Sequence, residues 1–256
     1  MATPNYVPGQ VAGQRTAEID AGLKAHMNKV YALMTGAMIL TGLVSYVFGM
    51  DLKAASAGEP TTLIPVGLLQ VMFTSPIMYV VMFAPLIMVF AFSAMINRMS
   101  ASTAQMVFWG FGAVMGLSIS HIFAVFTGIS IAQTFFATAA AFGALSLYGY
   151  TTKKDLSGWG SFLIMGVFGL IIASLLNMFI FESTAMQWAI SALGVLIFAG
   201  LTAYDTQSIK NEYLAMRSIP GGEVWLEKGA IMGALRLYLD FINMFMFLLQ
   251  FMGDRE

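Results

Sequence analysis

Seven apolar segments, each about as long as a membrane-spanning helix, occupy most of this chain. Roughly twenty apolar residues in a helix cross the ~30 Å hydrocarbon core of a bilayer. The segments are continuously apolar and lack the long alternation of period two that marks a transmembrane barrel. We therefore predict an all-α integral membrane protein, with transmembrane helices near residues 30–50, 77–97, 104–124, 129–150, 158–181, 185–207 and 230–252.

Composition agrees with a membrane protein and excludes several kinds of site. The sequence is 59% hydrophobic and 10% charged, whereas soluble proteins average roughly 45–50% apolar and 25% charged residues. It has no cysteine, which excludes disulfides, thiolate metal sites and thiol catalysis. It also has no basic tract and no glycine-rich phosphate loop. We expect membrane lipid as its surroundings, and no nucleic-acid partner, no cofactor and no enzymatic activity.

The ends and loops of the chain predict its orientation. Residues 1–28 are polar, so we expect a cytoplasmic N-terminal tail, followed by a seven-helix transmembrane domain over residues 29–256. Lysine and arginine are enriched in cytoplasmic loops. With the N-terminus inside, only Lys53 and Arg255 fall outside, and nine basic residues fall inside: Arg15, Lys24, Lys29, Arg98, Lys153, Lys154, Lys210, Arg217 and Lys228. We therefore predict a multi-pass protein of the cell inner membrane with a cytoplasmic N-terminus and an external C-terminus.

Two local features add to this framework. Residues 51–76 join the first two spans and form either an outer loop or a short interfacial helix. In the third span, Gly112 and Gly116 are four residues apart, a spacing typical of closely packed membrane helices. We interpret this pair as a packing contact only.

The sixth and seventh spans each carry polar or small residues along one face. In the sixth span these are Gln187, Ser191, Gly194, Thr202 and Asp205. In the seventh span they are Arg236, Asp240, Asn243 and Gln250. Spacings of three, four and seven residues place side chains on one face of a helix. An ionised side chain at bilayer depth costs at least ~2.5–3.5 kcal/mol, so both faces must meet protein or water.

The acids on these two faces, Asp205 and Asp240, are the best candidates for functional residues. Asp205 lies two or three residues from the predicted end of the sixth span. Asp240 lies about ten residues, or ~15 Å, inside the seventh. We expect the two acids to meet only if the sixth helix is tilted or the inner membrane boundary is recessed.

Three short motifs lie around these acids and before the fifth span. They are Ala203-Tyr-Asp-Thr-Gln-Ser-Ile-Lys210, Leu237-Tyr-Leu-Asp-Phe-Ile-Asn243 and Lys153-Lys-Asp-Leu-Ser157. All three resemble the Bax inhibitor-1 family, the transmembrane Bax inhibitor motif proteins, in a bacterial form. The resemblance extends over roughly residues 25–252. It implies a fold in which six helices wrap as hairpins around a central seventh helix.

The same resemblance implies a function and the residues that perform it. The family pattern is a pH-sensitive calcium leak channel in which two aspartates share a proton, and an arginine on the second helix can pair with one of them. Carried over by position, the aspartates are Asp205 and Asp240 and the arginine is Arg98. Calcium is then a permeant ion, and Asp205, Asp240 and Asn243 offer it the oxygen ligands that it prefers.

The chemistry of a carboxyl pair agrees with this mechanism. Two carboxylates at hydrogen-bond distance in a poorly solvated site cannot both ionise cheaply, so the pair titrates as a unit. A shared proton holds the sixth and seventh helices together, and its loss replaces a hydrogen bond with repulsion. Arg98 can then compete for Asp205. The contact would be a two-state element biased by protons.

Arg236 departs from the expected pattern. It precedes Asp240 by one helical turn, where we expect a small neutral residue in close relatives. An arginine there could stabilise the ionised form of Asp240 and repel a divalent cation. Alternatively, its side chain could extend toward water at the cytoplasmic end of the helix. The sequence leaves both interpretations open.

Three functions of other classes also remain open. A diaspartyl intramembrane protease would need Gly-x-Gly-Asp around its second acid, where this chain has Tyr238-Leu-Asp240. A proton-coupled transporter tends to have a matched pair of interrupted spans, whereas Pro85 is the only proline inside a predicted span. The third is a non-conducting regulator that binds another membrane protein, such as a quality-control protease, as the resemblance also suggests.

Overall fold

The computed structural model describes the backbone of residues 8–220 and 222–255. Residues 1–7 of the predicted tail and Glu256 lie outside the described residues, and so do the side chains of residues 8–18, 223 and 224. Residues 8–28 form the beginning of the first helix, which continues without a break into the first span.

The described chain is helical, which confirms the all-α class. Its α-helices are α1 (Pro8–Ser56), α2 (Val66–Thr74), α3 (Ile77–Met95), α4 (Ala101–Ile119), α5 (Ile122–Val125), α6 (Gly128–Thr151), α7 (Ser157–Leu176), α8 (Thr184–Arg217) and α9 (Glu223–Met252). A 3₁₀ turn, η1 (Ile96–Arg98), follows α3, and a π-helical turn, η2 (Asn177–Phe181), follows α7. Within the described residues, seven helices are long and apolar enough to cross a membrane, which confirms the predicted number. Helix α2 supplies the short helix that was one of the two expectations for residues 51–76.

Two predicted spans lie inside longer segments. The third, expected over residues 104–124, lies within the apolar segment Ala101–Val125, which consists of α4, a turn and the short helix α5. The sixth span was expected to end at residue 207, but α8 continues for ten more residues to Arg217. Hydropathy marks where a helix leaves apolar surroundings, whereas a polar segment can continue the same helix in water. The sequence therefore located the membrane part of α8 but not its end.

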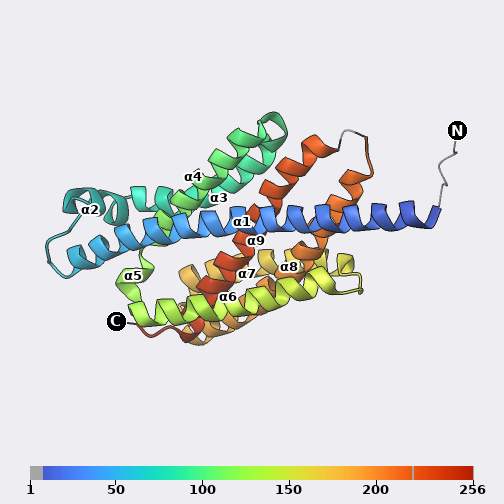
Figure 1. Ribbon diagram of the computed structural model, residues 1–256. Coiled ribbons are helices and arrows are strands. Elements are labelled where there is room, and N and C mark those ends of the chain that lie inside the picture. Colours follow the sequence, from blue (N-terminus) through green and yellow to red (C-terminus); the bar gives the residue numbers. More distant parts are fainter. Residues whose placement is uncertain (1–7, 221, 256) are drawn as a thin grey trace, which may run out of the picture.

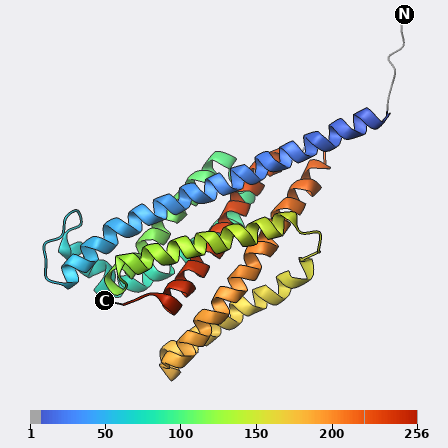
Figure 2. The same cartoon turned by 60° about the horizontal axis from the view of Figure 1, so that its bottom comes forward.

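The helices form two groups on either side of α1, as Figure 1 shows. Helices α3 and α4 lie on one side, and α6, α7 and α8 lie on the other. Helix α9 runs between the groups and packs against α1, α4, α6 and α8. In the second view, α9 again runs between α4 and α8 (Figure 2).

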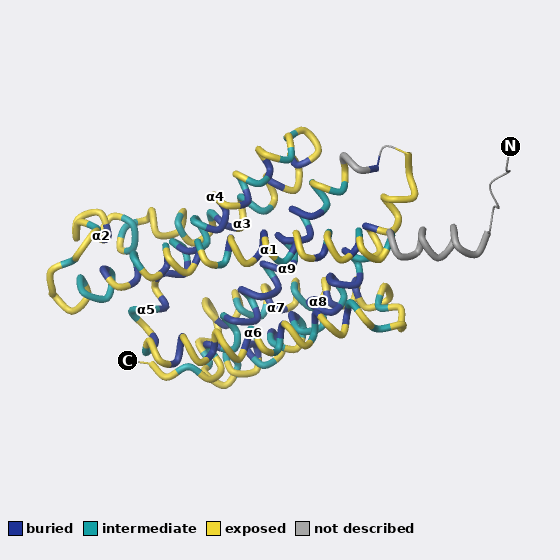
Figure 3. The backbone as a smooth tube through the Cα atoms, in the orientation of Figure 1, coloured by how far each residue is buried: buried dark blue, intermediate teal, exposed yellow. Residues whose placement is uncertain are grey.

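Helix α9 is the most enclosed of the seven described spans. In its most apolar stretch 61% of the residues are buried, against at most 39% in the others, and Figure 3 shows this burial along most of its length. Helices α3 and α7 are the least enclosed, at 11% and 17%, and pack mainly on α4 and α8. That six helices wrap around α9 as hairpins stays a prediction.

The glycine pair on α4 confirms the predicted packing contact. A Cβ atom at Gly112 would lie 3.0 Å from the carbonyl oxygen of Ala37, and one at Gly116 would lie 2.5 Å from that of Thr41. Both oxygens belong to α1. The two backbones can approach this closely because the glycines have no side chain.

The two ends of the bundle differ in charge. We call one the basic end; it carries the α6–α7 loop with Lys153 and the end of α8 with Arg217, and lies on the right in Figure 1. The acidic end carries the α1–α2 loop with Glu59 and the C-terminal Asp254, and lies on the left. The basic end is the one that the sequence predicts to face the cytoplasm.

Candidate functional site

The register of α8 and α9 brings their polar faces together. The two helices run antiparallel and are joined at the basic end. Asp205 lies twelve residues before the end of α8 at Arg217, and Arg236 lies thirteen residues after the start of α9 at Glu223. Arg236 is therefore nearly level with Asp205, and Asp240 follows one turn deeper. The expected difference in depth is reduced to about one helical turn, because the continuation of α8 places Asp205 well inside that helix.

Asp205 and Asp240 meet between these helices. Their carboxyl groups lie within hydrogen-bonding reach of each other. Asp240 is 3% exposed and Asp205 is 9% exposed. The Oδ2 atom of Asp240 is buried and has no hydrogen-bond partner among the described residues. The structure thus brings together the two acids that the sequence singled out, in a poorly solvated place.

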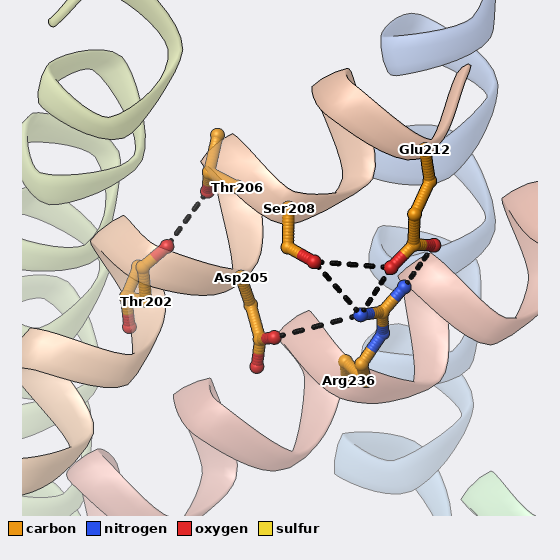
Figure 4. A network of polar contacts seen from close by, with 6 residues as sticks. All are labelled: Thr202, Asp205, Thr206, Ser208, Glu212 and Arg236. Atoms are coloured by element: carbon orange, nitrogen blue, oxygen red, sulfur yellow. Dashed lines mark hydrogen bonds and ion pairs between the residues drawn. The ribbon is translucent and has the colours of Figure 1, made fainter. Parts of the chain in front are cut away.

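Arg236 joins this pair to a third acid that the sequence analysis did not select. Its Nη1 atom donates to Oε1 of Glu212 at 2.9 Å, and its Nη2 atom donates to Oε2 at 2.6 Å. The Nη1 atom is also 3.7 Å from Oδ1 of Asp205. Figure 4 shows the guanidinium between the two carboxylates. The sequence left open whether Arg236 acts on the aspartates or extends toward water at the cytoplasmic end of the helix. In the structure the side chain does both, because it extends toward the basic end and yet stays beside Asp205.

Ser208 of α8 is hydrogen-bonded to both Glu212 and Arg236. Its hydroxyl donates to Oε1 of Glu212 at 3.0 Å and accepts from Nη1 of Arg236 at 3.5 Å. Asp205, Ser208 and Glu212 are spaced by three and four residues, so they continue the polar face of the sixth span toward the basic end. That spacing is the signal that could have found Glu212. It was missed because the predicted span ended at residue 207.

Hydroxyl groups fix α8 next to Asp205. Tyr31 of α1 and Ser146 of α6 are hydrogen-bonded through their hydroxyl oxygens at 2.5 Å. Ser146 contacts the hydroxyl of Thr206 at 2.9 Å, and Thr206 donates to the Thr202 carbonyl at 2.8 Å. Three helices are thereby tied together at the residue that follows Asp205. Satisfying these buried hydroxyls stabilises the position of the aspartate.

Helix α9 is fixed two residues before Asp240. The Tyr238 side chain is fully buried, and its hydroxyl contacts the Thr41 hydroxyl at 2.7 Å. The Tyr238 ring packs edge-on against Phe108 and Phe111 of α4. Thr41 also donates to the Gly112 carbonyl at 2.8 Å, at the close contact between α1 and α4.

Two of the motifs that carry the family resemblance meet in space. Gln207, which ends the Asp-Thr-Gln segment, accepts a hydrogen bond from the backbone N–H of Leu156 at 2.8 Å. Its Nε2 atom donates to the Lys154 carbonyl at 2.8 Å. Both partners belong to the loop before α7. The Lys153–Ser157 motif thus has a structural role here, because its bonds to Gln207 anchor this loop to α8 beside the site.

The structure does not bring Arg98 to the aspartates. Arg98 ends η1 at the surface, and no hydrogen bond or ion pair joins it to any part of the chain that the structure describes. Helix α3 packs on α2 and α4 and has no extensive contact with α8. The basic residue beside Asp205 is Arg236 instead. Pairing of Arg98 with Asp205 stays a prediction about another state of the protein.

The polar face of α9 continues toward the acidic end. Asn243 donates to the Leu239 carbonyl at 2.8 Å, within its own helix. Gln250 accepts from Gln187 of α8 at 2.7 Å and from Ser191 at 3.4 Å. The two polar faces predicted for the sixth and seventh spans therefore contact each other at the aspartates and again at Gln250. The sequence predicted only that each face meets protein or water.

Aromatic rings fill the space on the acidic-end side of Asp240. Phe241 packs against Phe135 and Phe142, with ring centroids 5.6 and 5.5 Å apart. Phe198 of α8 stacks on Phe247 of α9 at 5.9 Å. Among the residues that the structure describes, no group of three or more His, Cys, Asp or Glu side chains is arranged to hold a metal ion.

Comparison with known proteins places the chain among bacterial membrane proteins. Residues 23–256 match the family described as inhibitor of apoptosis-promoting Bax1. The chain is 42% identical to the Inner membrane protein YbhL of Escherichia coli K12, over 92% of this chain and 94% of that protein. It is 39% identical to an uncharacterized protein of Rickettsia prowazekii, over 98% of this chain and 99% of the other. An uncharacterized protein of Caulobacter vibrioides is 40% identical over 98% of this chain and 97% of its own length.

Proposed function

This chain belongs to the Bax inhibitor-1 family, and from that premise we propose that it is a pH-sensitive calcium leak channel of the inner membrane. The observation that carries the proposal is the meeting of Asp205 and Asp240 between α8 and α9, in a buried place. Two carboxyls so placed share one proton, because ionising both without solvent is costly. Seven apolar helices and a relative named as an inner membrane protein support the location.

Loss of the shared proton opens the contact between the two helices. With the proton present, one carboxyl donates to the other and holds α8 and α9 together. Without it, two negative charges repel each other in a medium of low dielectric. The helices then separate, and water and calcium reach the carboxylates. Calcium is the transported ion, and the oxygens of Asp205, Asp240 and Asn243 are hard ligands of the kind that it prefers.

The arrangement of aromatic rings corresponds to the closed state in this scheme. Phe241 and Phe247 lie beyond Asp240 toward the acidic end and pack against rings of α6 and α8. Opening must therefore move α9 relative to α6 and α8, which carry the partner rings.

Calcium uptake into liposomes that contain only the purified protein tests the proposal. Uptake should change with external or internal pH over a range of about one to two units, as expected for one proton shared by two groups. Protein-free liposomes measure the background. Wild-type liposomes that take up calcium at the background rate at every pH would exclude the leak.

A non-conducting regulator is a second candidate, and α1 favours it. This helix has 49 residues, which at 1.5 Å per residue is ~74 Å, more than twice the hydrocarbon thickness. Its first part extends past the other helices at the basic end (Figure 2), where another membrane protein could bind it. Such a regulator would give no calcium uptake in protein-only liposomes and would co-purify with its partner from membranes.

A further inference from the structure

Arg236 is shared between two carboxylates, and the structure shows which one holds it. Both of its terminal nitrogens bond to Glu212, at 2.6 and 2.9 Å, whereas its nearest approach to Asp205 is 3.7 Å. Two parallel N–H···O bonds between arginine and a carboxylate are the strongest geometry available to this pair. Ser208 holds the Glu212 carboxylate in the orientation that receives them. Glu212 is therefore the main partner and Asp205 the secondary one.

The Arg236 guanidinium lies where a cation leaving the aspartates toward the basic end would pass. The side chain of Glu212 is 48% exposed, that of Arg236 is 29% exposed and that of Asp205 is 12% exposed. The three side chains thus lead from water to the buried pair. A fixed positive charge on this route repels a divalent cation, and it does so more strongly the closer it lies to Asp205.

Three other basic residues near the basic end have partners outside this group of side chains. The His26 ring of α1 packs against Tyr213, with ring centroids 4.9 Å apart. Lys29 pairs with Glu227 at 3.4 Å, and Lys210 donates to the Tyr150 carbonyl at 2.9 Å. Arg236, in contrast, lies within ion-pair distance of Asp205, and its bonds to Glu212 set its position.

We propose that Glu212 is a positioning residue that holds the positive charge of Arg236 away from Asp205. It thereby keeps the route between the aspartates and the basic end open to cations. This inference rests on the proposed calcium leak. Without Glu212, Asp205 is the described carboxylate that remains within ion-pair distance of Arg236, and the guanidinium closes onto it. Without Arg236, this route is lined by the carboxylates of Asp205 and Glu212, and the positive charge between them is gone.

This proposal predicts opposite effects for the two halves of one ion pair. Glu212→Gln should lower the calcium flux, because Arg236 moves onto Asp205. Arg236→Gln should raise it, because the repelling charge is gone. Partly exposed ion pairs shift equilibria by up to about fivefold, so we expect changes of that size. The double variant should behave like Arg236→Gln, since Glu212 has no arginine left to hold.

Calcium uptake and thermal unfolding are measured together for these three variants at the pH of maximal wild-type flux. Both single variants lose the same ion pair, so their unfolding temperatures should fall alike while their fluxes move apart. Glu227→Gln is the matched control. It removes the exposed pair with Lys29 on α1 and makes the same charge change on α9. Its flux should equal that of the wild type.

A readout that does not depend on flux separates this inference from the proposed function. The chain has five arginines, so the side-chain Nε–H signal of Arg236 can be assigned by substitution in an NMR spectrum of the protein in nanodiscs. Glu212→Gln should shift this signal, and Asp205→Asn should shift it much more in the Glu212→Gln background than in the wild type.

The outcomes are distinct. If the wild type conducts no calcium, the leak is excluded, and the NMR signal alone decides whether Glu212 positions Arg236. If Glu212→Gln leaves the Arg236 signal unmoved, the positioning role is excluded. If both single variants change flux in the same direction and in proportion to their loss of stability, the pair is structural only and the inference is overturned.

Discussion

At the scale of single residues, the chemistry of this protein depends on Asp240. It is almost completely buried, and one of its oxygens has no partner among the described residues. A buried, unpaired carboxylate is costly, whereas a protonated carboxyl can donate to Asp205 and satisfy both groups. In the proposed mechanism, a single proton therefore decides whether α9, the most enclosed of the described helices, and α8 attract or repel each other.

Replacing either aspartate by asparagine should abolish the pH response of calcium flux. Asparagine keeps a hydrogen bond to the remaining carboxylate but cannot titrate, so the switch is lost while the helices stay together. The change in stability should be roughly 1 kcal/mol or less, the net value of one hydrogen bond. Calcium uptake across a pH series for Asp205→Asn and Asp240→Asn measures this.

Asp155→Asn is the matched control for that series. Asp155 lies in the exposed α6–α7 loop, and hydrogen bonds from the Ser157 hydroxyl and backbone N–H lower the pKa of its carboxyl. It thus stays ionised throughout the assay range, and asparagine can accept the same backbone bond. Its pH profile should match that of the wild type. Unchanged profiles in both Asp205→Asn and Asp240→Asn would show that the proton sensor lies elsewhere.

At the scale of helices, the contact between α1 and α4 supports the site from a distance. Gly112 and Gly116 allow the close approach in which Thr41 reaches the Gly112 carbonyl and also the Tyr238 hydroxyl. Tyr238 lies two residues before Asp240. The spacing of α1 and α4 is thereby linked through hydrogen bonds to the register of α9.

Gly116→Ala should destabilise the protein, and Gly110→Ala should not. A Cβ at Gly116 would lie 2.5 Å from a backbone oxygen, whereas one at Gly110 would meet nothing within 4 Å. Overpacking of this kind costs roughly 1–3 kcal/mol, and alanine is otherwise the better helix former at both positions. Thermal unfolding in detergent measures the difference. Equal unfolding temperatures for the two variants would mean that α1 and α4 are not closely packed in the membrane.

At the scale of the whole molecule, the bundle separates two surfaces of different charge. The basic end carries the loops before α7 and α9, and the acidic end carries the loop after α1 and the C-terminus. The arginine and glutamate beside the aspartates lie on the side of the basic end. In the proposed mechanism, the direction from which protons and calcium reach the site therefore depends on which end faces the cytoplasm.

Single cysteines in this cysteine-free chain should report that orientation. Ala57→Cys and Asp254→Cys at the acidic end should react with an impermeant thiol reagent in intact cells. Asp155→Cys and Pro220→Cys at the basic end should react only after the membrane is permeabilised. In this orientation nine basic residues lie on the cytoplasmic side and two lie outside. Lysine and arginine are retained on the cytoplasmic side, which favours it. Labelling of residues 155 and 220 in intact cells would show that the chain has the reverse orientation.

The sequence by itself determined the features that depend on neighbouring residues. The number of spans follows from the length of each apolar run, and the polar faces of α8 and α9 follow from the spacing of Asp205, Asp240 and Gln250 along each helix. The contact at Gly112 and Gly116 follows in the same way. Each of these features depends on the residue pattern of a single helix and not on which other helices it packs against.

Only the tertiary structure decided which groups meet. Helix α8 continues into water beyond its apolar run, and this length sets Asp205 level with Arg236. Glu212 enters the site because Arg236 reaches across from α9 to that extra part of α8. Arg98, in contrast, stays at the surface in η1, the turn that follows α3. Such pairings depend on helix register and on side-chain reach between elements distant in sequence, and these are set by the packing of the whole bundle.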